Sequence, residues 1–173
     1  MVLLLKPTTI DDYDEYYKIR CSPADIYWNG YESKPDKNQF KDLFKTRLGD
    51  APFEKAEDRR LFLIQVRTEN KLYNVGFLQL IKRIDGIDIG YSIIEGHQRK
   101  GYATKALLQG IKMAFDFDKN IYVQIRDDNI ASQGVAKKCG FVRTDDYVVN
   151  FYPCVGNVKL RKYVYPFPQP DNL

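Results

Sequence analysis

The segment with the clearest chemical meaning is a strand that turns through a glycine-containing loop into a helix. The loop reads Gln98-Arg99-Lys100-Gly101-Tyr102-Ala103. The first amides of a helix lack internal partners and carry part of the helix dipole, so they attract anions. Small residues at Gly101 and Ala103 would let a pyrophosphate approach those amides, with Arg99 and Lys100 adding positive charge. An ordinary strand-to-helix turn with solvated basic residues fits the spacing equally well.

The elements that must position this loop follow from the spacing of apolar residues. A period of two predicts strands and a period near 3.6 predicts helices. The predicted strands are 2–6, 61–67, 75–83, 87–94, 121–125, 141–151 and 158–165, and the predicted helices are 10–20, 37–48, 102–117 and 129–139. Segments 21–35 and 50–60 are predicted to be loops, and the proline-containing tail 166–173 to be loose.

The order of these elements predicts an α/β fold built on a mixed, mostly antiparallel twisted sheet flanked by helices. Asp85-Gly86 is a strong hairpin signal between the third and fourth strands, so three antiparallel strands precede the helix at 102–117. That helix is expected to cross over to a parallel strand at 121–125, which is nearly all apolar and so buried on both faces. Gly140 suits the left-handed position after the last helix. We expect one domain over 1–173.

Composition and charge exclude several classes of protein. A chain of 173 residues with 44% hydrophobic and 14% aromatic content fits one folded domain rather than a disordered segment. The net charge of +4 suits an anionic ligand but is too scattered to predict a nucleic-acid binder. Cys21, Cys139 and Cys154 are far apart, which predicts reduced thiols and neither a disulfide framework nor a metal site. No stretch is apolar enough for a signal peptide or a membrane span, so we expect a cytoplasmic protein.

Three segments, in the right order and at the right separation, resemble the GNAT superfamily of acyltransferases. Gln98-x-x-Gly101-x-Ala103 is similar to its acyl-CoA loop, and Asp88-Ile-Gly-Tyr-Ser-Ile looks like its fourth strand. The segment from Asn129 to Phe141 looks like its later Asn-x-x-Ser…Lys-x-Gly-Phe segment. The start of the chain resembles the branch of ribosomal-protein N-terminal acetyltransferases. The resemblance covers nearly the whole chain and is weakest at 23–60 and after Tyr152.

The resemblance implies acetyl-CoA as co-substrate and direct transfer of its acetyl group to a primary amine, in a peptide N-terminus or a small molecule. It also implies a splay between the fourth and fifth strands that holds the pantetheine arm. Loop amides would hold the pyrophosphate, and a fourth-strand amide would hold the acyl carbonyl. The implied cofactor-binding residues are Ile93, Ile94, Gln98, Arg99, Lys100, Gly101, Tyr102, Ala103, Thr104, Asn129 and Ser132. For Asn129, a plain helix N-cap is the simpler interpretation, and both roles can hold together.

This chemistry benefits from a base, because a lysine amine has a pKa of about 10.4 and must lose a proton before it attacks. Asp88 is the first candidate, since superfamily members often carry a glutamate on this strand, and an apolar setting would raise its pKa. The competing interpretation is an exposed residue just past the Asp85-Gly86 turn. Glu95, at the mouth of the loop, is the second candidate, and a solvated loop acid is its simpler interpretation. His97 is a bystander by the same reasoning.

The acceptor site should come from the variable segments 21–35, 50–60 and 147–157. Tyr27, Trp28 and Tyr31 are the candidate substrate-binding residues, because aromatic rings can flank an amine. They fit a core or a dimer contact as well, so a homodimer stays open. One position departs from the superfamily pattern, since Ala136 stands where many members carry a tyrosine that protonates the leaving thiolate. That departure favours the alternative function, a non-catalytic acyl-CoA-binding regulatory module. A basic RNA-associated protein is the third hypothesis.

Overall fold

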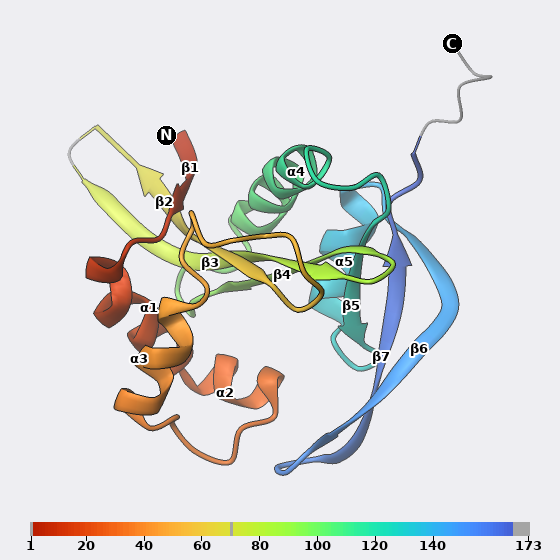
Figure 1. Ribbon diagram of the computed structural model, residues 1–173, viewed down its shortest axis with the longest axis horizontal. Helices are drawn as coiled ribbons and strands as arrows, with labels where there is room; N and C mark the ends of the chain where they lie inside the picture. The colour runs from red at the N-terminus through yellow and green to blue at the C-terminus, as the bar shows by residue number, and fades with distance from the viewer. Residues whose placement is uncertain (1, 70, 168–173) are drawn as a thin grey trace.

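The sheet at the centre of the molecule contains seven strands in the order β1-β2-β3-β4-β5-β7-β6. The computed structural model describes residues 2–69 and 71–167. The strands are β1 Val2–Pro7, β2 Arg59–Arg67, β3 Leu72–Arg83, β4 Gly86–Ile93, β5 Ile121–Arg126, β6 Val142–Tyr152 and β7 Gly156–Val164. The helices are α1 Tyr13–Arg20, α2 Pro23–Asn29, α3 Lys37–Lys45, α4 Tyr102–Ala114 and α5 Ile130–Lys138, with a 3₁₀ turn at Ile10–Asp12 (Figure 1).

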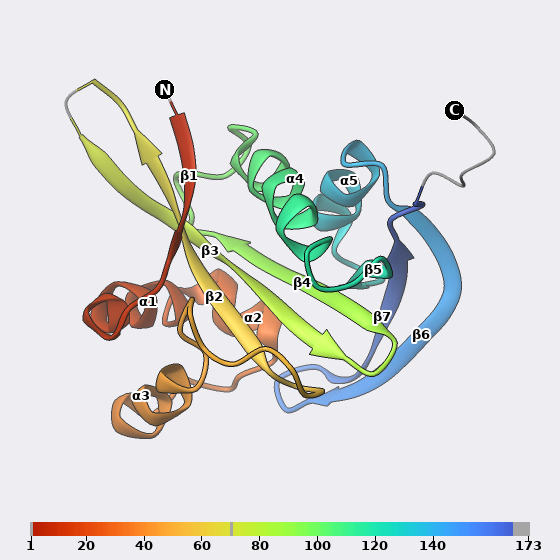
Figure 2. The same cartoon turned by 45° about the horizontal axis from the view of Figure 1, so that its top comes forward.

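The helices cover the two faces of the sheet unequally. Figure 2 shows α4 and α5 on one face and α1, α2 and α3 on the other. The α4 face holds the larger core, in which Ile87, Ile89 and Ile93 of β4 pack against Ala106 and Leu107. The smaller core under α1 and α3 contains the aromatic side chains of both helices together with Leu61, Leu63 and Phe77. Alternate residues of β4 therefore face two different environments.

The predicted topology is confirmed. Strands β2, β3 and β4 form an antiparallel meander, and α4 crosses over to β5, which pairs with β4 in parallel. Strand β3 is longer than predicted, beginning at Leu72 instead of 75, and β2 begins at Arg59 instead of 61. Of the tail predicted to be loose, Phe167 packs on Phe115 with ring centroids 5.5 Å apart, and 168–173 lie outside the described residues.

The prediction of a loop over 21–35 was wrong, because α2 lies within it. Ser22 caps this helix by accepting a hydrogen bond from the Asp25 amide at 3.3 Å, and Pro23 occupies its first turn. Gly30 ends it in the left-handed conformation, at φ 74°. A side chain at this glycine would meet the ring of Tyr152 at 2.2 Å, so the end of α2 packs directly against the β6–β7 hairpin.

The C-terminal end of α5 closes as predicted. Gly140 adopts a left-handed φ of 91°, and the Phe141 amide donates to the Ala136 carbonyl at 3.1 Å. This is the bond pattern expected when a glycine follows the last helical turn and an apolar residue folds back. None of the helices described in the structure is long and apolar enough to cross a membrane.

Strands β4 and β5 pair only at their beginnings and then separate. The paired residues are Ile87 with Ile121 and Asp88 with Tyr122. Beyond them the two strands diverge, which is the predicted splay between the fourth and fifth strands. The carboxyl ends of both strands lie at the open end, and each is followed by the start of a helix, α4 after β4 and α5 after β5.

Candidate functional site

The loop between β4 and α4 exposes the first amides of a helix to open space. Gly101 occupies the N-cap of α4 at φ 77°, and no side chain caps the helix among the described residues. Arg99 also has a positive φ, 59°. A Cβ built on Gly101 would meet no atom within 4 Å, so the space in front of the loop is open. Left-handed residues next to a helix start form a concave set of amides suited to an anion.

Two of the predicted loop residues use their side chains to brace the loop itself. The Gln98 amide donates to the Ile93 carbonyl at 2.9 Å, and the Lys100 ammonium donates to the Gly96 carbonyl at 2.8 Å. Arg99 and Lys105 are exposed and add positive charge nearby, whereas Tyr102 is buried in the core beneath α4. Ala103 and Thr104 are half-buried in the first turn of the helix. The loop thus offers its backbone outward, while several side chains support it from within.

The candidate residues of α5 flank the other side of the splay. The side-chain oxygen of Asn129 accepts from the Ser132 amide at 3.0 Å, so Asn129 is the N-cap of α5. Tyr91 of β4 reaches across and donates from its hydroxyl to the Ser132 carbonyl at 3.4 Å. Burial raises the pKa of Tyr91 to about 12. The cap and the tyrosine together hold the start of α5 beside the open end of β4.

The hydrogen bonds of β4 distinguish the two amides that were predicted to hold an acyl carbonyl. The Ile94 amide donates to the Val75 carbonyl of β3 at 3.0 Å. The Ile87 amide instead donates toward β5, to the Asn120 carbonyl at 2.9 Å. Because amide direction alternates along a strand, Ile93 shares the direction of Ile87 and its amide faces the splay. Of the two, Ile93 is the amide directed at the gap.

Asp88, the first candidate base, is buried beneath an arginine. It is 5% exposed, and its Oδ2 lies 3.3 Å from Nη2 of Arg83. Burial raises the pKa of Asp88 to about 6, with the charges of Arg83 and Arg59 opposing that rise. Asp88 precedes Ile93 by five residues, a distance of about 16 Å along a strand. At that separation Asp88 reaches an acyl group held at Ile93 only through a chain of waters.

The buried charge of Asp88 predicts a stability that depends on pH. A folded-state pKa of about 6, against 3.8 without burial, means that the folded chain holds this proton more tightly than the unfolded chain. The free energy of unfolding therefore falls by about 3 kcal/mol as the pH rises from about 4 to about 6, and it stays lower by that amount at higher pH. The free energy of unfolding of Asp88→Asn, relative to that of wild type, should therefore rise by about 3 kcal/mol from pH 4 to pH 8. Urea unfolding at both pH values measures this, and a difference that does not change with pH contradicts it.

Glu95 and His97 lie in the exposed turn that follows β4. The Glu95 side chain is exposed, and the His97 amide donates to the Ile94 carbonyl at 3.2 Å. The centroid of the His97 ring lies 6.1 Å from that of Tyr73 and 6.5 Å from that of Tyr102. Glu95 is therefore near the mouth of the loop, whereas Asp88 lies at the opposite, paired end of the splay.

Two of the three predicted substrate-binding aromatics surround an arginine at the end of β5. The Arg126 guanidinium lies 4.9 Å from the ring centroid of Tyr27, 4.8 Å from that of Trp28 and 5.6 Å from that of Tyr152. Its Nε and Nη2 donate to Asp128 at 2.9 Å and 2.6 Å. Arg126 is 5% exposed, so this cluster fastens α2 and the hairpin to the carboxyl end of β5.

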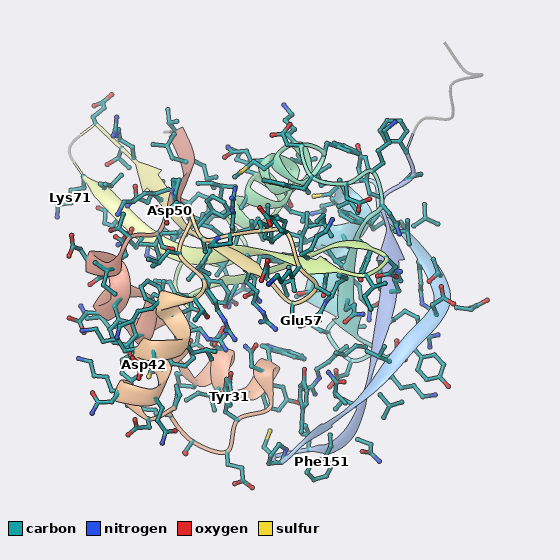
Figure 3. All side chains as sticks on the ribbon, in the orientation of Figure 1. Tyr31, Asp42, Asp50, Glu57, Lys71 and Phe151 are labelled. Atoms are coloured by element: carbon teal, nitrogen blue, oxygen red, sulfur yellow. The ribbon has the colours of Figure 1, made fainter. Side chains whose placement is uncertain are left out.

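Tyr31 belongs to a different cluster and lines a groove. Its hydroxyl accepts from Nη2 of Arg20 at 3.1 Å. The groove has a volume of about 680 Å³ and lies between the α2–α3 connection and the tip of the β6–β7 hairpin. Figure 3 shows Tyr31 on one side and Phe151 on the other. Tyr31 therefore links the groove to Arg20 at the end of α1.

Sequence reasoning missed Arg126, Arg20, Asp25 and Tyr152. Arg126 ends an apolar strand, and a charged residue that ends a buried strand is a usable signal for a site. Arg20 and Asp25 lie five residues apart across a helix boundary, and their contact depends on how α1 meets α2. Tyr152 is brought to Arg126 by a hairpin that begins after α5. These three positions carry no local pattern that would reveal their partners.

Comparisons with known proteins agree with this geometry. A family model described as an acetyltransferase (GNAT) domain matches residues 2–142. Spermidine N-acetyltransferase from Vibrio cholerae, solved with CoA and spermine, has a TM-score of 0.74 at 18% identity and covers 94% of this chain and 95% of that one. A GNAT-family acetyltransferase from Bacillus anthracis has a TM-score of 0.72 at 19% identity, covering 95% and 94%. A proposed ribosomal-protein-serine acetyltransferase from Vibrio cholerae has a TM-score of 0.66 at 21% identity, covering 95% and 94%. A search of curated proteins finds no match.

Proposed function

Because the chain belongs to the GNAT acetyltransferase family, whose model matches residues 2–142, we propose that it transfers the acetyl group of acetyl-CoA directly to a primary amine. Acetyl-CoA is the co-substrate of this family. The observation that carries the proposal is the juxtaposition of two features at one edge of the sheet. The strands β4 and β5 separate there, and the uncapped helix start at Gly101 faces open space beside them.

Each part of acetyl-CoA has a place along the loop and the gap between β4 and β5. The pyrophosphate is assigned to the amides of residues 99–104, with Arg99 and Lys105 supplying charge. The pantetheine arm is assigned to the gap between β4 and β5, with Asn129 and Ser132 along its α5 side. The amide of Ile93 then polarises the acyl carbonyl, since an amide aimed at a developing oxyanion stabilises it. The thioester carbon is thereby presented toward the α2 side of the sheet.

On the α2 side, the amine attacks the polarised carbon. A carbon–nitrogen bond forms, the carbon–sulfur bond breaks, and the electron pair leaves with the CoA thiolate. The amine must lose a proton, so a base on this face is required for acceptors that are charged at neutral pH. The groove beside Tyr31 offers a route for a primary amine at a peptide N-terminus or in a small molecule. Spermine in one similar structure is an amine of the second kind.

A second candidate function, a non-catalytic acyl-CoA-binding module, is favoured by one observation. Ala136 is fully buried and occupies the position of the tyrosine that many family members use to protonate the thiolate. A methyl group donates no proton. A CoA thiolate leaves without that help more readily than an alkoxide or amide would, so this position alone does not abolish turnover.

Calorimetric titration of the wild-type protein with acetyl-CoA tests the shared part of both functions. We expect one site per chain with a dissociation constant on the order of 1–100 μM, the range in which enzymes bind such substrates. Adenosine 3′,5′-bisphosphate, which lacks the pantetheine arm, should bind more weakly. A folded protein that does not bind acetyl-CoA overturns the proposal and its alternative together.

A further inference from the structure

A second buried carboxylate, Asp25, lies on the same side of the sheet as Asp88 but at the opposite end of β4. It is in the first turn of α2 and is 2% exposed. Its Oδ2 lies 3.0 Å from Nη1 of Arg20, which is itself 5% exposed at the end of α1. Arg20 also donates a hydrogen bond to the hydroxyl of Tyr31, which lines the groove. A buried ion pair therefore connects the groove to the interior under α2.

The register of the sheet places this ion pair over Ser92. The Arg20 guanidinium lies 5.3 Å from the ring centroid of Phe77, and Phe77 of β3 is directly opposite Ser92 of β4. Directly opposite residues share a face, so Ser92 points toward α2 as Phe77 does. Ser92 and Phe77 thus lie on the face of the sheet that Arg20 and Asp25 cover, and the Ser92 side chain favours the charged form of the Asp25 carboxyl. Ser92 is half-buried, which leaves its hydroxyl within reach of the acceptor side.

The distances along β4 decide between the two carboxylates. Ser92 immediately precedes Ile93, whose amide faces the splay, so the hydroxyl and the carbonyl-binding amide belong to adjacent residues. Asp88 lies five residues from Ile93, or about 16 Å, which requires several ordered waters in between. A proton leaving the amine at the thioester therefore meets the Ser92 hydroxyl first.

The Asp25 carboxyl has capacity to take up that proton. Within the described part of the chain, no donor makes a hydrogen bond of good geometry to either of its oxygens. Burial raises the pKa of Asp25, and Arg20, Ser92 and Asn29 oppose the rise. Tyr16, from α1, is a titratable group that also senses its charge. The ion pair with Arg20 thus keeps the carboxyl charged, while burial makes it ready to take up a proton.

We propose that Asp25 accepts the amine proton through the Ser92 hydroxyl, which makes Ser92 the catalytic residue and Asp25 the group that acts through it. This inference rests on the proposed acetyl transfer. As the carbon–nitrogen bond forms and the carbon–sulfur bond breaks, the nitrogen gives a proton to Oγ of Ser92. Ser92 gives its own proton to Oδ of Asp25, and the thiolate leaves as CoA. Asp25 then returns the proton through the hydroxyl of Ser92, which is half-buried, to solvent.

The test is a cycle of Ser92→Ala, Asp25→Asn and the double variant, measured as amine-dependent release of CoA thiol. Each single change is expected to lower kcat/KM by about 100-fold or more, the usual contribution of a positioned acid or base. The double variant should be no worse than the singles, because the two groups act as one unit. The fall in kcat at low pH with saturating amine, which reports the base in the enzyme–substrate complex, should be lost in Asp25→Asn and kept in Asp88→Asn.

Two controls separate this relay from a structural role of the ion pair. Ser92→Ala leaves the side chains of Arg20 and Asp25 in place, so we expect it to fold as the wild type does. Ser22→Ala removes the N-cap bond to the Asp25 amide but leaves the side chains of Asp25, Arg20 and Ser92 unchanged, and it should keep kcat within about threefold. Ser92→Ala that keeps wild-type kcat/KM, or Asp25→Asn that keeps it, overturns the relay while the wild type still acetylates amines. Wild-type protein that binds acetyl-CoA but acetylates no amine overturns the acetyl transfer instead.

Discussion

Replacing Gly101 with glutamate is expected to weaken acetyl-CoA binding by at least about 100-fold. A Cβ at this position projects into open space, where the account places the pyrophosphate. The new carboxylate would lie close to two phosphate charges, and like charges about 4 Å apart near a surface repel by about 4 kcal/mol. The left-handed φ of 77° adds strain for any side chain. Calorimetric titration of the folded variant with acetyl-CoA measures the loss.

The hairpin offers a matched control for this substitution. Gly156 has nearly the same backbone, with φ 80°, and a Cβ there also meets nothing within 4 Å. Gly156→Glu thus introduces the same strain and the same charge in the turn between β6 and β7, away from α4. It should bind acetyl-CoA within about threefold of wild type. Equal binding by Gly101→Glu and wild type would remove the pyrophosphate from this loop.

Replacing Arg126 with alanine is expected to lower the free energy of unfolding by about 3 kcal/mol. The change removes a buried guanidinium that contacts the rings of Tyr27, Trp28 and Tyr152. It leaves those rings around a cavity, and truncation of a large buried side chain costs roughly 2–5 kcal/mol. Asp128 is largely exposed and is not stranded. A loss of this size in a chain of 173 residues corresponds to a fall in Tm of about 10 °C.

Arg161 is the matched control for Arg126. It also bonds an aspartate, Asp127 at 3.2 Å, and lies 5.1 Å from the centroid of an aromatic ring, Tyr147. Both partners are exposed, so Arg161→Ala should cost less than about 1 kcal/mol. Thermal unfolding of both variants makes the comparison. Equal losses would show that Arg126 does not fasten α2 to β5, and that Tyr27 and Trp28 are held by other contacts.

The sequence predicts the sheet and the loop well because both depend on local patterns. The alternation of apolar residues in β2, β3 and β4 reflects burial on one or both faces, and Asp85-Gly86 fixes the turn between β3 and β4. The loop at Gly101 can be predicted from the sequence because a left-handed N-cap requires glycine or a similarly tolerant residue. Helix α2 could have been predicted as well, since Ser22, Pro23 and Gly30 are ordinary signals for the start and the end of a helix.

The acceptor side of the site could not be predicted in the same way. Asp25 meets Arg20 through the angle between two helices, and it meets Ser92 through the packing of α2 on the sheet. Arg126 collects aromatic residues from α2 and from β6, which are far apart in the chain. Hydrophobic periodicity contains no information about such contacts. Asp88 was the visible candidate because it lies in the recognisable strand, and its partner Arg83 lies only five residues away.

The most direct test of the central claim is to incubate the protein with acetyl-CoA and a panel of primary amines, and to follow CoA thiol release with mass spectrometry of the acceptor. The panel should include spermidine, free amino acids and short peptides with Ser or Ala at the N-terminus. We expect thiol release that depends on one of these amines and an equal amount of its acetylated product. Thiol release without any amine, or acetyl-CoA binding with no acetylated product from any member of the panel, would contradict it.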